Sequence, residues 1–233
     1  MPQVADVLAS LDKQVPRHLV DVMKTYDISP RVECSTDSEG EEAATQSRSN
    51  AKGKSGGADR HGGKPVLVLD MDETLIHTQF NASGTHTVLH RPGLADFLAT
   101  MDKVYYLVVF TAGSARYAEA VMNAIDPNKH VKHRMSREQC SPTPDGVCCK
   151  DLRKVPDVDM ARTIIVDNIP ENYDLQPDNG IPIIDFVGDP HDDALKVLTP
   201  MLLQFAKDPS LDARTFLGKH MKPCGSALHS GYY

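Results

Sequence analysis

The chain has few cysteines, and they form no recognisable set. Five occur among 233 residues, at positions 34, 140, 148, 149 and 224. Their number is odd and no two have the C-x-x-C spacing, so neither a disulfide framework nor a zinc site is indicated. A C-x5-R motif, which a cysteine-based phosphatase requires, is also missing.

Long apolar runs and an excess of positive charge are missing too. No apolar run reaches the roughly 18 residues that a membrane-spanning helix needs, and the first residues lack the basic start and apolar core of a secretion signal. The net charge of −7 argues against a face that binds nucleic acid directly. We therefore expect no membrane span, a reducing compartment, and a cytoplasmic or nuclear protein.

The chain divides by composition into four parts. Residues 1–32 carry Val4, Val7, Leu8 and Leu11 on one helical face, which favours a helix that packs on the domain or binds a partner. Residues 33–64 are rich in Ser, Gly, Glu, Lys and Ala, which predicts a disordered linker. Residues 65–217 are expected to form the folded domain, and 218–233 a C-terminal tail.

Strand and helix patterns alternate along the predicted domain. Apolar runs predict strands at 65–70, 104–110, 130–135, 162–168 and 181–184, the last at a sheet edge because it contains Pro182. Helical patterns cover 93–101, 114–125 and 189–206. This alternation predicts an α/β fold, a mainly parallel sheet flanked by helices on both faces.

The run from Val66 to Leu75 carries the strongest chemical signal. An apolar strand ends in two carboxylates, Asp70 and Asp72, and a hydroxyl at Thr74. Oxygen ligands suit Mg2+, one carboxylate can attack phosphorus, and the second can move a proton to and from the leaving oxygen. The alternatives are a solvated acidic turn or a Ca2+ loop, but the Gly and Glu that a Ca2+ loop requires are not placed correctly.

Further polar residues complete the candidate site, and Thr111 and Asp167 among them stand at the ends of predicted strands. The hydroxyl of Thr111 and the amide of Ala112 after it can bind phosphoryl oxygens at a helix start, although Thr111 alone could be a simple helix cap. Lys150 can neutralise phosphate charge or be an ordinary surface lysine. Asp167 and Asn168 can hold Mg2+ or orient the lysine, or they can be turn residues. Because active sites of parallel sheets lie beyond the carboxyl ends of strands, we expect these groups to form one site.

This order of motifs resembles the haloacid dehalogenase superfamily. The matching stretches are Asp70-Met71-Asp72-Glu73-Thr74, Phe110-Thr111-Ala112, Lys150-Asp151-Leu152 and Val166-Asp167-Asn168-Ile169-Pro170. More narrowly, residues 65–217 are similar to the small C-terminal-domain phosphatases, the SCP/Dullard or NLI-interacting-factor group, with further matches at Arg91-Pro92, Arg116-Tyr117-Ala118 and Arg137-Glu138-Gln139-Cys140.

The resemblance implies a role for each candidate residue. Asp70 is expected to be the nucleophile and Asp72 the general acid and base. Mg2+ is expected on the Asp70 carboxylate, the Asp72 main-chain carbonyl and Asn168. Phosphate or substrate contacts are expected from Thr74, Thr111, Ala112, Lys150 and Arg137. Asp167 is expected to contact these residues rather than the substrate.

The spacing between the motifs limits the class of substrate. About forty positions separate Asp70 from Thr111, and about as many separate Thr111 from Lys150, which leaves no room for a large cap domain. An open site suits a phosphoserine or phosphothreonine on a protein surface. We therefore predict a Mg2+-dependent protein serine/threonine phosphatase that acts through an aspartyl-phosphate on phosphoprotein substrates. The alternatives are an inactive phosphopeptide-binding scaffold of the same fold and a small-molecule phosphatase.

Overall fold

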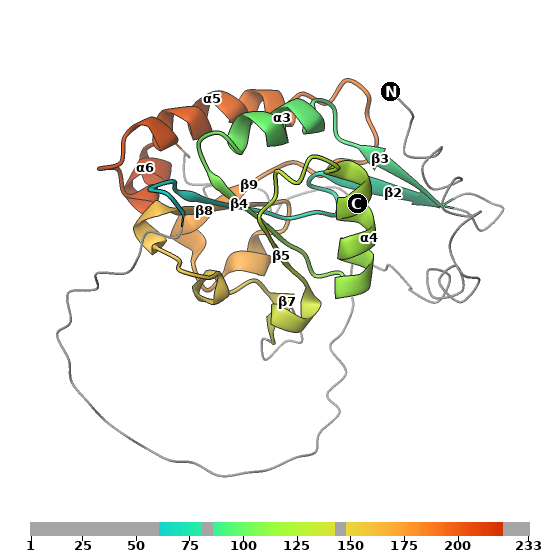
Figure 1. Cartoon of the computed structure of the whole chain (residues 1–233), viewed down its shortest axis with the longest axis horizontal. Coiled ribbons are helices and arrows are strands. Elements are labelled where there is room, and N and C mark those ends of the chain that lie inside the picture. Colours follow the sequence, from blue (N-terminus) through green and yellow to red (C-terminus); the bar gives the residue numbers. More distant parts are fainter. Residues whose placement is uncertain (1–60, 81–85, 143–147, 221–233) are drawn as a thin grey trace, which may run out of the picture.

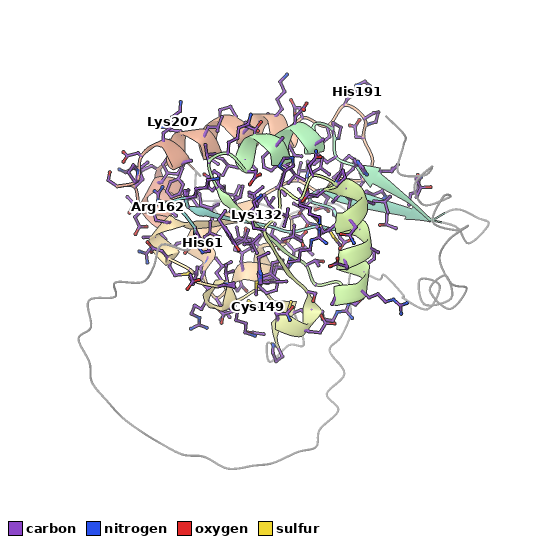
Figure 2. The ribbon with its side chains drawn as sticks, viewed as in Figure 1. His61, Lys132, Cys149, Arg162, His191 and Lys207 are labelled. Atoms are coloured by element: carbon purple, nitrogen blue, oxygen red, sulfur yellow. The ribbon has the colours of Figure 1, made fainter. Side chains whose placement is uncertain are left out.

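A computed structural model describes residues 61–80, 86–142 and 148–220. The predicted N-terminal helix and most of the predicted linker and tail lie outside these residues. The folded part extends slightly beyond the predicted bounds of 65 and 217. At its start, His61 (labelled in Figure 2) packs its ring on Tyr106, with ring centroids 4.0 Å apart, and its Nε2 lies 3.1 Å from the Pro156 carbonyl. No helix in the described part is long and apolar enough to cross a membrane.

The centre of the fold is a five-stranded parallel sheet in the order β5-β4-β1-β8-β9. Its strands are β1 (Val66–Leu69), β4 (Tyr106–Phe110), β5 (His133–Met135), β8 (Thr163–Asp167) and β9 (Gly180–Pro182). All four residues of β1 and all five of β8 are buried, as expected for strands covered on both faces. The predicted fold class is confirmed, and β9, with its proline, lies at an edge as predicted.

The two faces of the sheet are covered differently. Leu67 and Leu69 of β1 share a core with the helices α3 (Leu94–Met101), α4 (Ala115–Ile125), α5 (Ala194–Lys207) and α6 (Ala213–His220). Figure 1 shows α3 and α5 side by side over the sheet. Val66 and Val68 instead meet Leu152, Val155 and Tyr173.

The second face differs from the prediction of helices on both sides. In the described part of the chain it is covered by irregular segments with short 3₁₀ turns. The 3₁₀ turns of the chain are η1 (Arg137–Gln139), η2 (Leu152–Lys154), η3 (Met160–Arg162), η4 (Pro170–Tyr173) and η5 (Pro177–Asn179).

Two antiparallel pairs were not predicted. Strands β2 (Ile76–Phe80) and β3 (His86–His90) form a hairpin directly after the first motif. Strands β6 (Ser141–Pro142) and β7 (Cys148–Cys149) pair just before Lys150. Within residues 61–80, 86–142 and 148–220 no cap domain is present.

Helix α5 begins at Ala194, five residues later than predicted. The segment from Asp189 forms a turn because Asp192 is drawn into an ion pair with Arg91. The Asp192 carboxylate also accepts a hydrogen bond from the Ala194 backbone at 3.0 Å. Asp192 therefore satisfies one backbone N–H at the start of α5, whereas the side chain of the N-cap residue, Asp193, makes no cap hydrogen bond.

Candidate active site

Lys150 connects two strand ends through a buried ion network. Asp70 follows β1, and its backbone N–H donates to the Val166 carbonyl at 2.9 Å, which fixes it beside the end of β8. The Lys150 side chain is fully buried, and its ammonium donates to Oδ1 of Asp70 and, at 2.6 Å, to Oδ2 of Asp167. The alternative of an ordinary surface lysine is therefore wrong.

The Asp167 carboxylate also accepts hydrogen bonds from groups other than Lys150. Its Oδ1 accepts hydrogen bonds from the Ile169 backbone at 2.9 Å and from the Asn172 side chain at 3.0 Å. The Asn172 carbonyl in turn accepts from the Lys150 backbone at 2.6 Å. Asp167 and Asn172 thus fix both the main chain and the side chain of Lys150.

Asp72 receives two hydroxyl donors. The Tyr117 hydroxyl, from α4, lies 2.6 Å from Oδ1, and the Thr111 hydroxyl, after β4, lies 3.2 Å from Oδ2. The Tyr117 hydroxyl also lies 3.2 Å from that of Thr78 in β2. The hairpin and α4 therefore orient this carboxylate together.

A tight loop places Thr74, the last residue of the first motif, beside Asn168. The backbone amides of Leu75 and Ile76 both donate to the Met71 carbonyl, and Glu73 has a positive φ of 58°. This turn buries Thr74, whose hydroxyl donates to Oδ1 of Asn168 at 3.3 Å. The first and last motifs therefore meet at this hydrogen bond.

Thr111 is not the cap of the helix that follows. Ser114 caps α4 by accepting from the Tyr117 backbone, whereas the Thr111 hydroxyl accepts from the Gly113 amide at 2.9 Å. Arg137 donates through Nε to the Ala112 carbonyl at 2.7 Å. The structure thus places Arg137 against the Thr111–Gly113 loop, at the same edge of the sheet.

Four residues that contact the candidate site were not predicted from the sequence as site residues: Arg91, Tyr117, Asn172 and Asp185. Arg91 is almost fully buried and pairs with both oxygens of Asp192 at 2.7 and 2.8 Å. It also donates to the carbonyls of Thr74 at 3.0 Å and Ile184 at 2.8 Å. Arg91 therefore ties the first motif to the segment after β9.

Asp185 lies in that segment and contacts Asn168. The Asn168 side-chain amide donates to Oδ1 of Asp185 at 3.1 Å. Asp185 follows a predicted strand, so the rule that found Asp70 and Asp167 could have found it as well.

Burial sets the electrostatics of the carboxylates. Loss of hydration raises the pKa of Asp70 to about 7, although Lys150 opposes this change. Burial also raises the pKa of Asp72, against the hydrogen bonds from Tyr117 and Thr111. Burial disfavours the charged form of Lys150, but Asp167 and Asp70 outweigh it and raise the pKa of the ammonium.

The chemistry of the oxygen donors at this edge fits a hard divalent cation. The Asp70 carboxylate, the Asp72 main-chain carbonyl and the Asn168 amide oxygen are all ligands of the kind that Mg2+ prefers. Within the described ranges no three His, Cys, Asp or Glu side chains gather as a metal cluster. The donor set is thus a mixture of carboxylate, amide and main-chain oxygens.

The fold and the site define the class. A parallel sheet with two carboxylates after its central strand, a hydroxyl after the next and a lysine bridging to a third strand is a haloacid dehalogenase-like arrangement. Residues 65–213 match the family described as NLI interacting factor-like phosphatase. The chain belongs to this family.

Several known proteins are similar to the chain. The probable C-terminal domain small phosphatase of Dictyostelium discoideum is 38% identical over 158 residues, which cover 61% of this chain and 51% of that protein. CTD nuclear envelope phosphatase 1B of Danio rerio is 37% identical over 171 residues, 62% of this chain and 69% of that protein. A solved structure of Fcp1, an essential RNA polymerase II CTD phosphatase, has 21% identity and a TM-score of 0.45, covering 62% of this chain and 49% of that one.

The match does not extend over the full length of these relatives. The first three curated relatives are covered over 50%, 39% and 51% of their own lengths. The chain thus spans about half of them or less.

Proposed function

We propose that the chain is a Mg2+-dependent protein serine/threonine phosphatase that acts through an aspartyl-phosphate. The observation that supports it most is Lys150, fully buried between Asp70 and Asp167 at the carboxyl edge of the sheet. A lysine that is desolvated between two carboxylates is costly to the fold, and such costs are concentrated at functional sites.

Asp70 acts as the nucleophile in this proposal. One of its carboxylate oxygens attacks phosphorus, and the bond between phosphorus and the serine or threonine oxygen of the substrate breaks. The Lys150 ammonium holds the Asp70 carboxylate in place and balances the negative charge of the phosphoryl group. Asp167 and Asn172 fix the position of that ammonium.

Asp72 moves the proton. Its raised pKa favours a protonated carboxyl that can donate to the leaving oxygen of the substrate. In the second step the Asp72 carboxylate takes a proton from the water that attacks phosphorus, and the bond from phosphorus to Asp70 breaks. Tyr117 orients the carboxylate for both transfers.

Mg2+ would be held by the Asp70 carboxylate, the Asp72 main-chain carbonyl and the Asn168 amide oxygen. When bound, it would balance the charge of the phosphoryl oxygens. Thr74 and Asp185 hold the Asn168 side chain from two sides, so its orientation is fixed by the protein.

Phosphate contacts are assigned to the loop after β4 and its neighbours. The Thr111 hydroxyl, the Ala112 amide and the Lys150 ammonium would bind phosphoryl oxygens. Arg137, anchored through Nε on the Ala112 carbonyl, would present the rest of its guanidinium to the substrate. Thr74 completes the set through its bond to Asn168.

A phosphoprotein is the substrate class that the fold favours. The described chain contains no cap over the carboxyl edge of the sheet, so a folded protein or an extended segment can reach Asp70. The relatives named as C-terminal domain phosphatases support a protein substrate. A cytoplasmic or nuclear location is part of this proposal, and a relative named as a nuclear envelope phosphatase supports it. An inactive scaffold and a small-molecule phosphatase are the alternatives that the experiment must separate.

The test is hydrolysis of a chromogenic aryl phosphate by wild type and Asp70→Asn, with Mg2+ and with a chelator. Activity should require both Asp70 and the metal, whereas Asp96→Asn, which changes an exposed carboxylate on α3, should match wild type. Well-folded wild type without turnover would favour the scaffold. Turnover of sugar phosphates far above that of phosphopeptides would favour the small-molecule enzyme.

A further inference from the structure

Three exposed apolar residues belong to the two segments that contain the candidate metal ligand Asn168 and its partner Asp185. Among the described residues, the large apolar side chains that are exposed are those of Ile169, Leu175, Ile184, Val187 and Val197. Ile184 is 73% exposed and Val187 is 67% exposed. Solvent-exposed side chains of this size next to a reactive centre are characteristic of binding surfaces.

One hydrogen bond places three of these exposed residues next to the candidate metal ligand. Asn168 and Asp185 contact each other at 3.1 Å. Ile169 directly follows Asn168, Ile184 directly precedes Asp185, and Val187 lies two residues after it. We call Ile169, Ile184 and Val187 the apolar rim, because covalent connection alone keeps all three next to this edge of the site.

The backbone of the rim is fixed. The Ile184 carbonyl accepts from Arg91 at 2.8 Å, and the Phe186 amide donates to the Glu73 carbonyl at 2.7 Å. Phe186 is buried, with the Arg91 guanidinium 5.6 Å from its ring centroid. With Phe186 turned inward, its neighbours are presented outward from a backbone held at two points.

A rim of this kind binds at low cost. Because its backbone is already ordered, a partner that covers it pays little conformational entropy for the protein side. Burial of two aliphatic side chains then contributes to affinity in proportion to the area covered.

Negative charge close to the apolar rim limits which peptide residues the rim can bind. Asp185 lies between Ile184 and Val187, and Glu73 is joined to Phe186 through the backbone. The Glu73 carboxylate is bonded to His77 at 2.8 Å, so Asp185 is the carboxylate that would repel an acidic residue of a bound segment here. An apolar residue avoids this repulsion and covers the rim.

We propose that the apolar rim binds the substrate segment that flanks the phosphorylated residue, through an apolar side chain and without an acidic neighbour. The proposal rests on the proposed phosphatase function and names the kind of sequence that this site selects. The occupant is a phosphoprotein segment because the rim adjoins Asn168, the candidate Mg2+ ligand at the edge of the sheet where Asp70 would attack the phosphoryl group.

The test compares phosphoserine peptides that differ at the flanking positions, with Leu, Ser or Asp beside the phosphoserine. The double variant Ile184→Ser/Val187→Ser should raise KM for the Leu peptide by about tenfold, with kcat and aryl phosphate turnover changed less than about twofold. For wild type the order of kcat/KM should be Leu, then Ser, then Asp. The matched control is Val197→Ser, because Val197 is equally exposed, at 67%, but lies on α5.

Several results would overturn the proposal. These are equal KM changes for the Leu and Ser peptides, an effect of Val197→Ser as large as that of the double variant, or a wild type without preference. A dimer in sedimentation that the double variant abolishes would assign the rim to a second copy of the chain. Faster aryl phosphate turnover by the double variant would assign it to a covering segment of the chain itself.

Failure of the proposed function would be recognised separately. If wild type hydrolyses no aryl phosphate, calorimetric binding of the three phosphopeptides to wild type and to the double variant still tests the rim. Tighter binding of the Leu peptide that is lost in the double variant would support the rim on an inactive protein. Equal binding of all three peptides would reject it.

Discussion

Replacing Lys150 by methionine should both stop turnover and destabilise the fold. The change leaves Asp70 and Asp167, which are 5% and 0% exposed, without their shared cation. Breaking a buried ion pair from one side costs about 3–5 kcal/mol. Asp167 keeps its donors from Ile169 and Asn172, so we expect a cost near the lower end, about 3 kcal/mol at pH 8.

The cost should fall as the pH is lowered. The pKa of Asp70, already about 7 in the native protein, should rise further when the ammonium is removed. A carboxyl whose folded pKa lies above its unfolded value binds more protons in the native state, so stability decreases as the pH rises toward the folded pKa. The variant should therefore lose more stability than wild type between pH 6 and pH 8, by up to about 1.4 kcal/mol per pH unit.

Urea unfolding at pH 6 and pH 8 measures both effects, with the unfolding midpoint as readout and an unchanged m-value as the check on two-state behaviour. Lys103→Met, at an exposed lysine, should stay within about 0.5 kcal/mol of wild type. Turnover of an aryl phosphate by Lys150→Met should fall by about 100-fold or more. A variant within about 1 kcal/mol of wild type at both pH values would refute the buried ion network described here.

The remaining predictions concern four other side chains. Asp70→Asn should reduce turnover to background while leaving the urea midpoint nearly unchanged; residual activity near wild type would exclude it as nucleophile. Tyr117→Phe removes a hydrogen bond that lowers the pKa of Asp72, so the limb of the kcat–pH profile that reports Asp72 should move to higher pH, and an unmoved limb would argue against this contact. Asp185→Ala should weaken Mg2+ binding, measured by calorimetry, by about tenfold, whereas Asp185→Asn, which keeps a carbonyl acceptor, should lose less; equal losses would assign the effect to charge. Arg91 lowers the pKa of Asp192, so Asp192→Asn should lower stability at pH 7 and lose its effect as the pH falls below about 4, where wild type also loses this contribution; a pH-independent loss would contradict the ion pair.

Local patterns identified most of the regular structure. The apolar runs around Val66–Leu69 and Thr163–Asp167 were readable as buried parallel strands because continuous aliphatic sequence requires cover on both faces. The proline of β9 correctly indicated an edge strand, since it cannot donate in the ladder. The helix starting near Asp189 was misplaced, because the pairing of Asp192 with a residue about one hundred positions away delayed its start.

Hairpin β2–β3 shows where local patterns failed. Its strands mix polar and apolar side chains without a clear alternation, and they belong to no larger sheet. Its importance lies in the position of Thr78, whose hydroxyl contacts Tyr117 across the site. That contact depends on how the hairpin folds over α4, which no short segment encodes.

The sequence alone determined the chemistry of the candidate site. Asp70, Thr111 and Asp167 stand at the ends of predicted strands, and parallel strands present their carboxyl ends at one edge. Lys150 was identified by the order of the motifs. Only the tertiary structure decided which roles their surroundings support. Lys150 is buried because β1 and β8 are neighbours that bring two carboxylates to one ammonium, and Arg91 and Asp185 join the site through contacts between distant segments. Side-chain type and local periodicity are properties of short stretches, whereas burial and pairing depend on which stretches become neighbours when the chain folds.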